Sequence, residues 1–116
     1  MEKQIQLFLR AYTADLYNEL KSLILRNTGE NILKISIDLG FYKSALSNMF
    51  SRFRYIPEYE KALTKFYIKT ILENEEKNID KKIEMIENYF TLLGEYKAFV
   101  KIKKGFNLER VLHLNT

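Results

Sequence analysis

The chain has 116 residues, of which 47% are hydrophobic and 29% charged, and its formal net charge at pH 7 is +4. A chain of this length can bury one hydrophobic core, so a single domain over residues 1–116 is expected. The lack of cysteine excludes disulfides, thiolate metal sites and thiol catalysis. The sequence has no long apolar run and no signal-peptide pattern, so neither membrane insertion nor export is expected. A cytoplasmic location follows weakly from this.

One proline and four glycines leave few places that break a helix, so a mainly α fold is expected. The first predicted helix covers residues 1–27, and Asn27-Thr28-Gly29 would end it. Apolar residues recur along it at steps of three and four, which is typical of an amphipathic helix. These residues are Ile5, Phe8, Leu9, Tyr12, Leu16, Leu20, Leu23 and Ile24.

Residues 31–54 have the pattern of a helix-turn-helix, with D-L-G-F-Y-K-S-A-L at Asp38–Leu46. Gly40 stands at the elbow, where glycine takes a left-handed or sharply turned conformation without a Cβ penalty. Ser36 is small enough to let the two helices cross closely. The apolar residues expected to form their shared core are Ile35, Leu39, Leu46, Met49 and Phe53.

The second helix of this unit is then left with an outward face of mostly small or polar residues, as a surface facing a DNA groove should have. Asn48 can present its amide to adenine N6 and N7, and Lys43 can donate to guanine O6 and N7. The outward residues are Lys43, Ser44, Ser47, Asn48, Ser51 and Arg52.

This run resembles the helix-turn-helix of the phage Cro-type repressors, in which D-L-G precedes a small or apolar residue, Tyr, a polar residue, Ser, Ala and a branched aliphatic. The matching positions are Asp38, Leu39, Gly40, Tyr42, Ser44 and Ala45. The resemblance covers about a fifth of the chain, residues 31–54. It implies base-edge contacts by Lys43, Ser44, Ser47 and Asn48. Lys43 stands where the family has Gln, and Ser47 and Asn48 stand where it has Asn and Lys, so a shared operator sequence is not implied.

The chain departs from the family at the start of its first motif helix, because Ile32 and Leu33 replace polar residues that contact phosphate. Other donors are therefore expected to contact the DNA backbone. They are Asn31, Lys34, Tyr42, Ser51, Arg52 and Arg54, although Tyr42 could instead pack at the edge of the core. Leu33 and Ile37 lie four apart on the outer face, and a further layer is expected to cover them.

Residues 57–94 are predicted to form a helical hairpin or a dimerisation region, with Pro57 opening one helix and Asn74–Asn78 forming a turn. The next apolar residues repeat at steps of four and three, the spacing of a coiled-coil seam. The seam could pack within the chain or join two copies, and its residues are Ile79, Ile83, Ile86, Phe90 and Leu93. A homodimer is expected on functional grounds, since one short recognition helix contacts too few bases for specificity.

Residues 95–116 are basic, and two structures are compatible with them. Ala98, Val100 and Ile102 alternate with lysines as in a strand, and Lys104-Gly105 could turn into a short C-terminal β-hairpin, which is the favoured prediction. In the alternative, a helix would place Lys97, Lys101 and Lys104 on one face. The formal charge is +2 over residues 30–57, −2 over 58–93 and +3 over 94–116, so it is positive at the motif and at the C-terminal segment.

Catalysis has little support, because there is a single histidine and no phosphate loop, zinc-protease motif or nucleophile elbow. No catalytic residue, metal or cofactor is predicted. The sequence predicts a helix-turn-helix core within a bundle of four to five helices. The expected function is a sequence-specific regulator that binds double-stranded DNA, of the phage or plasmid repressor type, acting on a palindromic operator as a homodimer. The alternative is a small helical module, or a phage-type inhibitor, that binds a protein partner.

Overall fold

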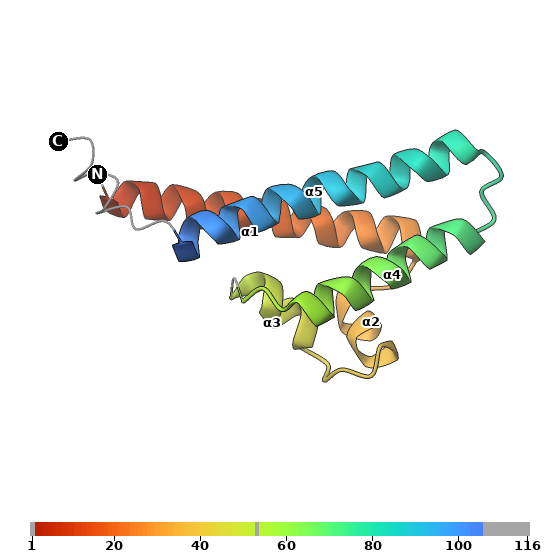
Figure 1. Ribbon diagram of the computed structural model, residues 1–116, viewed down its shortest axis with the longest axis horizontal. Helices are drawn as coiled ribbons and strands as arrows, with labels where there is room; N and C mark the ends of the chain where they lie inside the picture. The colour runs from red at the N-terminus through yellow and green to blue at the C-terminus, as the bar shows by residue number, and fades with distance from the viewer. Residues whose placement is uncertain (1, 53, 106–116) are drawn as a thin grey trace.

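The computed structural model describes the backbone of residues 2–52 and 54–105 and most of their side chains. Five helices follow one another: α1 (Glu2–Thr28), α2 (Ile32–Asp38), α3 (Ala45–Ser51), α4 (Pro57–Glu73) and α5 (Ile79–Gly105) (Figure 1). No strand occurs in these two stretches. The predicted mainly α bundle of four to five helices is therefore confirmed.

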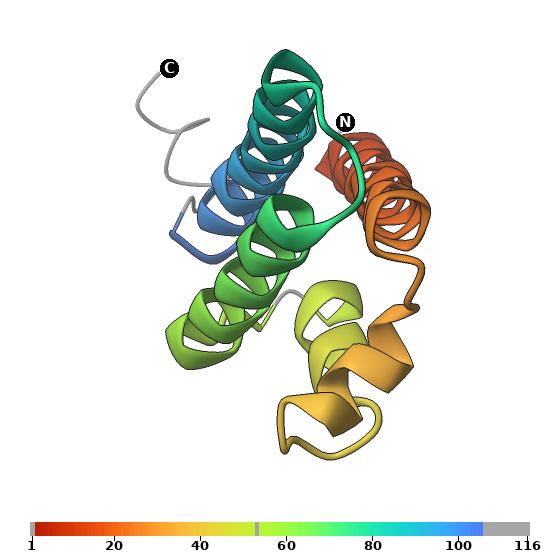
Figure 2. The ribbon, with the colours of Figure 1, turned by 90° about the vertical axis from the view of Figure 1, so that its right-hand side faces the viewer.

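The two long helices, α1 and α5, lie side by side and run in opposite directions (Figures 1 and 2). α5 returns along α4 after the turn at residues 74–78, and α2 and α3 form a separate pair beneath α1 and beside α4. The core lies where this pair meets α1, α4 and α5. Its fully buried side chains include Leu20, Ile24, Ile35, Leu46, Phe50, Leu63, Tyr67, Ile71, Tyr89 and Tyr96.

α1 ends at Thr28 because Gly29 takes a left-handed conformation with φ of +76°. The Gly29 amide donates to the Leu25 carbonyl at 2.8 Å, which satisfies one of the last carbonyl groups of the helix. The predicted inner residues Leu16, Leu20, Leu23 and Ile24 are buried as expected.

The N-terminal part of α1 differs from this prediction. Phe8 and Tyr12 are 63% and 37% exposed, because this part of α1 extends past the α2–α3 pair and packs mainly on α5. The Tyr12 ring contacts the Phe99 ring of α5 with centroids 4.5 Å apart. The side chains of Ile5 and Leu9 and the whole of Phe53 lie outside the described residues.

α4 begins with Pro57 in its first turn, where the missing amide hydrogen costs nothing, and it ends before the predicted polar turn. In that turn, the Glu76 and Asp80 amides donate to the side-chain oxygens of Asn74 and Asn78 at 3.1 and 3.0 Å. The hairpin predicted for residues 57–94 therefore forms, with α4 and α5 as its arms.

The predicted seam of α5 is divided between the core and the surface. Leu93 is 3% exposed and Ile86 packs against the core, whereas Ile79, Ile83 and Phe90 are 70%, 47% and 47% exposed. The buried side of α5 consists of Tyr89, Leu93, Tyr96 and Val100. The seam therefore does not lie on one face of the protein, and only its exposed part is accessible to a second molecule.

The strand predicted after residue 95 is wrong for residues 96–105, because α5 continues through Gly105. Tyr96 and Val100 are buried at a spacing of four, so packing against the bundle selects the helical period over the alternation of Ala98, Val100 and Ile102. The helical alternative is correct over this stretch. Lys97 forms an ion pair with Glu60 of α4 at 3.1 Å. The rest of the predicted hairpin, residues 106–116, lies outside the described residues.

Buried tyrosines form a hydrogen-bonded cluster between α1, α4 and α5. The Tyr67 and Tyr89 rings stack with centroids 4.4 Å apart. The Tyr67 hydroxyl donates to the Met85 carbonyl and accepts from the Asn27 amide, each at 2.8 Å. The Tyr89 hydroxyl lies 2.8 Å from the Thr64 hydroxyl. Each polar end is therefore paired, which removes most of the cost of burying it.

Burial raises the pKa of Tyr89 and of Tyr96 above the ordinary value of 10.0, which predicts a loss of stability at alkaline pH. Above that value tyrosines of the unfolded chain ionise while the buried ones stay protonated, so the unfolded state binds fewer protons. The stability is therefore complete below pH 10 and is lost as the pH rises from there towards the raised pKa.

Urea denaturation across this range should show a falling midpoint in the wild-type protein and a shallower fall in Tyr89→Phe. Tyr42→Phe, which removes a hydroxyl from a side chain that is 57% exposed, is the matched control and should follow the wild type. Equal slopes in all three proteins would contradict the prediction.

None of the described helices combines the length and the hydropathy needed to cross a bilayer.

Candidate nucleic-acid interface

The turn between α2 and α3 is built around Gly40, which has φ of +84° as the sequence predicted. The Gly40 amide donates to the Ile37 carbonyl and the Phe41 amide to the Ser36 carbonyl, each at 2.9 Å. This pair of bonds is the Schellman motif, which ends a helix at a left-handed residue. α2 and α3 are thus two short helices joined by a defined turn, and they pack on each other.

Ser36 joins α2 and α3. It is fully buried, and its hydroxyl donates to the Ile32 carbonyl at 3.1 Å and accepts from the Leu46 amide at 3.3 Å. The first amides of a helix have no partner within the helix, and the side chain of Ser44, which precedes α3, makes no capping bond. Ser36 of α2 therefore supplies the cap of α3.

Ser36→Ala is expected to lower the free energy of unfolding by about 1–2 kcal/mol, because the buried Leu46 amide loses its acceptor. Urea denaturation measures the change. Ser22→Ala, at an exposed position of α1, is the control and should shift stability by less than about 0.5 kcal/mol. The same small shift for Ser36→Ala would mean that its hydroxyl does not cap α3.

Aromatic residues fix the other end of α3. The Phe50 ring lies between Tyr17 of α1 and Tyr96 of α5, with ring centroids 5.2 and 5.1 Å away. The Tyr96 hydroxyl donates to the Phe50 carbonyl in the last turn of α3. The predicted recognition helix is thus held by α2 at its start and by α1 and α5 at its end. Sequence analysis missed the roles of Tyr17 and Tyr96, because neither lies near the motif.

The four residues predicted to contact bases lie at the start and on the outward side of α3. Lys43 is exposed, and Ser44, Ser47 and Asn48 are half-buried. Ser47 donates its hydroxyl to the Ser44 carbonyl at 3.2 Å, and the Asn48 amide nitrogen donates to the Ser44 hydroxyl at 3.4 Å. These bonds orient Asn48 and leave its side-chain carbonyl and one amide hydrogen available.

The predicted backbone contacts near α3 are also accessible. Tyr42 is 57% exposed, and Ser51, Arg52 and Arg54 are exposed. The Arg54 amide donates to the Met49 carbonyl at 3.0 Å, and this bond holds the Arg54 backbone against the last turn of α3. Residues 39–57 contain three basic residues and no acidic residue. The surface around α3 is therefore positive.

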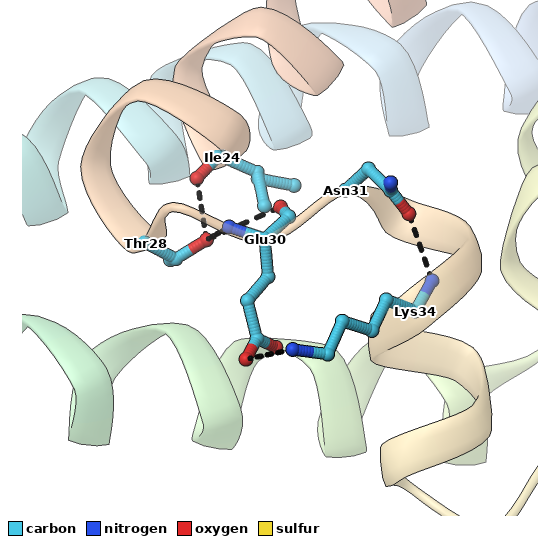
Figure 3. A network of polar contacts seen from close by, with 5 residues as sticks. All are labelled: Ile24, Thr28, Glu30, Asn31 and Lys34. Atoms are coloured by element: carbon cyan, nitrogen blue, oxygen red, sulfur yellow. Dashed lines mark hydrogen bonds and ion pairs between the residues drawn. The ribbon is translucent and has the colours of Figure 1, made fainter.

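The polar residues at the start of α2 contact one another (Figure 3). The Asn31 side-chain oxygen accepts from the Lys34 amide at 2.8 Å, and the Lys34 ammonium pairs with the Glu30 carboxylate at 3.3 Å. Thr28 accepts from the Glu30 amide at 3.2 Å, which holds this acidic residue at the helix start. Asn31 and Lys34 are thus engaged within the chain, next to a negative charge.

The outer face of α2 remains apolar and uncovered. Leu33 and Ile37 are 39% and 54% exposed, so the layer expected to cover them is not provided by the described part of the chain. No group of three or more histidine or carboxylate side chains in that part is placed to hold a metal ion.

A cavity that the sequence did not indicate lies beside the end of α3. It has a volume of about 420 Å³ and opens between α1 and α3. Arg10, Asn18, Ser51 and Arg52 contribute polar side chains to its lining. The two arginines are 42 positions apart, and no local pattern brings them together.

No protein-family model, no curated protein and no solved structure matches this chain.

Proposed function

We propose that this protein is a sequence-specific regulator that binds double-stranded DNA, of the repressor type, and that α3 enters the major groove. The observation that carries this proposal is the firm attachment of α3 to α2 and α5, together with a stretch free of carboxylates over residues 39–57. Small and amide side chains on that surface let the helix approach base edges, and flanking cations attract phosphate.

Within this proposal, Asn48 pairs with an adenine edge, accepting from N6 and donating to N7. Lys43, in the turn before α3, donates to guanine O6 and N7. Arg52 and Arg54 contact the backbone at the other end of α3, with Ser51 and Tyr42 as additional donors.

The test is selection from a random duplex library with the purified protein, followed by binding of the selected duplex across a salt series. We expect one enriched sequence and an affinity that falls steeply with added salt, because bound phosphates release counterions. A palindrome with half-sites about 10 base pairs apart is expected for a homodimer on one duplex. If the selection enriched no sequence and the protein bound every duplex weakly, the result would contradict the proposal and favour a protein partner.

The homodimer requires a surface, and we propose that it is the outer face of the α4–α5 hairpin. A groove of about 830 Å³ lies there, and Ile68, Leu72 and Phe90 form its apolar lining. Ile83, which lies on the same side of α5 as Phe90, extends this surface and is 47% exposed.

The charges beside the groove suit a second copy of the chain. Exposed lysines follow the α4 edge at steps of four: Lys61, Lys65 and Lys69. Exposed carboxylates lie beyond the apolar stripe on α5: Asp80, Glu84 and Glu87. A dimer that places α4 of one copy against α5 of the other brings opposite charges together while covering the apolar residues.

Phe90→Asp is expected to convert the dimer into a monomer, because it places a charge in the apolar centre of this surface. Sedimentation equilibrium measures the mass. Leu25→Asp is the matched control, since Leu25 is 50% exposed on α1 and Phe90 is 47% exposed. A monomeric wild-type protein, or a Phe90→Asp variant that remains dimeric, would contradict the proposed surface.

A further inference from the structure

The polar side chains at the start of α2 bond to one another and to the helix start. Lys34 is paired with the Glu30 carboxylate, and Asn31 caps α2, so the one cation at the start of α2 lies beside a negative charge. A recognition helix in the major groove lies between two phosphate backbones, and its orientation is fixed by contacts to them. Other elements that border α3 therefore have to provide these contacts.

The cavity between α1 and α3 carries two such cations. Arg10 and Arg52 both line it, are exposed, and form no ion pair with another described residue. Asn18 and Ser51 add uncharged donors, and no carboxylate lines the cavity. Guanidinium groups with neutral donors beside them are the usual partners of a phosphodiester.

Ser51 connects this cavity to the proposed recognition surface. It lies four positions after Ser47, on the outward side of α3, and also lines the cavity. A DNA strand that borders the groove occupied by α3 would therefore pass over the cavity opening.

Lys21 adds a third cation on the same side of α1. Its ammonium lies 4.6 Å from the centre of the Tyr17 ring, and that ring stacks on Phe50 of α3. Arg10 and Lys21 are eleven positions apart, three helical turns, so they lie on one stripe of α1. The stacked rings hold this stripe beside α3.

The acidic residues of this part of α1 lie on another side. Glu19 lines a different cavity, together with Arg26 and with Asn88 of α5. Asp15 lies four positions before it, on the same side of α1 as Glu19. Asp15 and Glu19 thus lie away from the side of α1 next to the recognition helix, which carries Arg10 and Lys21.

We propose that Arg10 and Lys21 of α1 act with Arg52 of α3 as a clamp for the phosphodiester backbone next to the major groove that α3 occupies. The inference rests on the proposed DNA binding and adds α1 to the interface. It assigns to the long N-terminal helix the anchoring that the start of α2 does not provide.

The experiment compares wild-type protein, Arg10→Ala/Lys21→Ala and Lys77→Ala/Lys81→Ala on the selected duplex and on an unrelated duplex, each across a salt series. Lys77 and Lys81 are exposed at the turn between α4 and α5 and at the start of α5, so this control removes the same charge away from α3 and from the proposed dimer groove. Loss of the clamp should reduce the slope of log affinity against log salt by about 2 and weaken both duplexes by the same factor. The control should keep the wild-type slope. Arg10→Lys/Lys21→Arg, which keeps both charges, should restore the slope, and unfolding curves confirm that each variant is folded.

A wild-type protein that binds the selected duplex, with an unchanged slope in Arg10→Ala/Lys21→Ala, would overturn the clamp and leave the proposed function intact. The same slope reduction in Lys77→Ala/Lys81→Ala would also overturn the clamp, since the reduction would then reflect net charge alone. A wild-type protein that binds no duplex would overturn both proposals.

Discussion

Phe50→Ala is expected to cost about 3–5 kcal/mol of unfolding free energy, the largest stability change predicted for this protein. Phe50 is 1% exposed, and its ring contacts Tyr17 and Tyr96, so truncation opens a cavity where α1, α3 and α5 meet. A domain of this size has a total stability of about 5–15 kcal/mol, and the variant could lose half of it.

Urea denaturation followed by circular dichroism measures this change. Phe8→Ala is the control, because Phe8 is 63% exposed on α1, and its cost should stay below about 1 kcal/mol. Similar costs for the two variants would mean that the aromatic contacts do not hold α3 in place.

Asn48→Ala is expected to weaken binding to the selected duplex by about 1–3 kcal/mol, which is roughly 5- to 150-fold, and to relax preference at one base pair. Asn48 is half-buried, and the only side-chain hydrogen bond that it makes within the described chain is the long one to the Ser44 hydroxyl, so stability should change little. Binding to duplexes that vary at each position measures both effects.

Arg54→Ala provides the comparison. Arg54 is exposed beyond the end of α3, so it is expected to weaken all duplexes by a similar factor. If Asn48→Ala also weakened every duplex alike, base recognition by Asn48 would be excluded, while backbone binding by the helix-turn-helix could remain.

Local signals predicted most of the helix boundaries. Gly29 and Gly40 adopt left-handed conformations at the ends of α1 and α2, and Pro57 lies at the start of α4. Asn74–Asn78 separates the last two helices. Each of these signals acts through the backbone of a few neighbouring residues, so it can be recognised without knowledge of the rest of the fold.

The C-terminal half was harder to predict because its core depends on tyrosine. Tyr89 and Tyr96 are buried, with their hydroxyls bonded to Thr64 and to the Phe50 carbonyl. A purely apolar pattern passes over these residues and selects Ile79, Ile83 and Phe90, which are exposed. Whether a tyrosine is buried depends on a partner for its hydroxyl, and such a partner comes from another element.

In the candidate site, too, local sequence patterns predicted some features, and contacts between distant residues decided others. Helical periodicity placed Ser47 and Asn48 on the outward side of α3, and the structure places them there. Periodicity could not show that Glu30 pairs with Lys34, since either residue could have reached another partner. Nor could periodicity predict that Arg10 of α1 and Arg52 after α3 line the same cavity.

The sequence by itself determined the helical class, the elbow at Gly40 and the set of residues left outward on α3, because these depend on backbone preferences and on a period of 3.6 residues. Only the tertiary structure decided which helix caps α3, which face of α5 is buried and which cations border the recognition surface. Those outcomes depend on contacts between residues 10 to 47 positions apart, such as Ser36 with Leu46 and Phe50 with Tyr96, and such contacts are selected by the packing of the whole core.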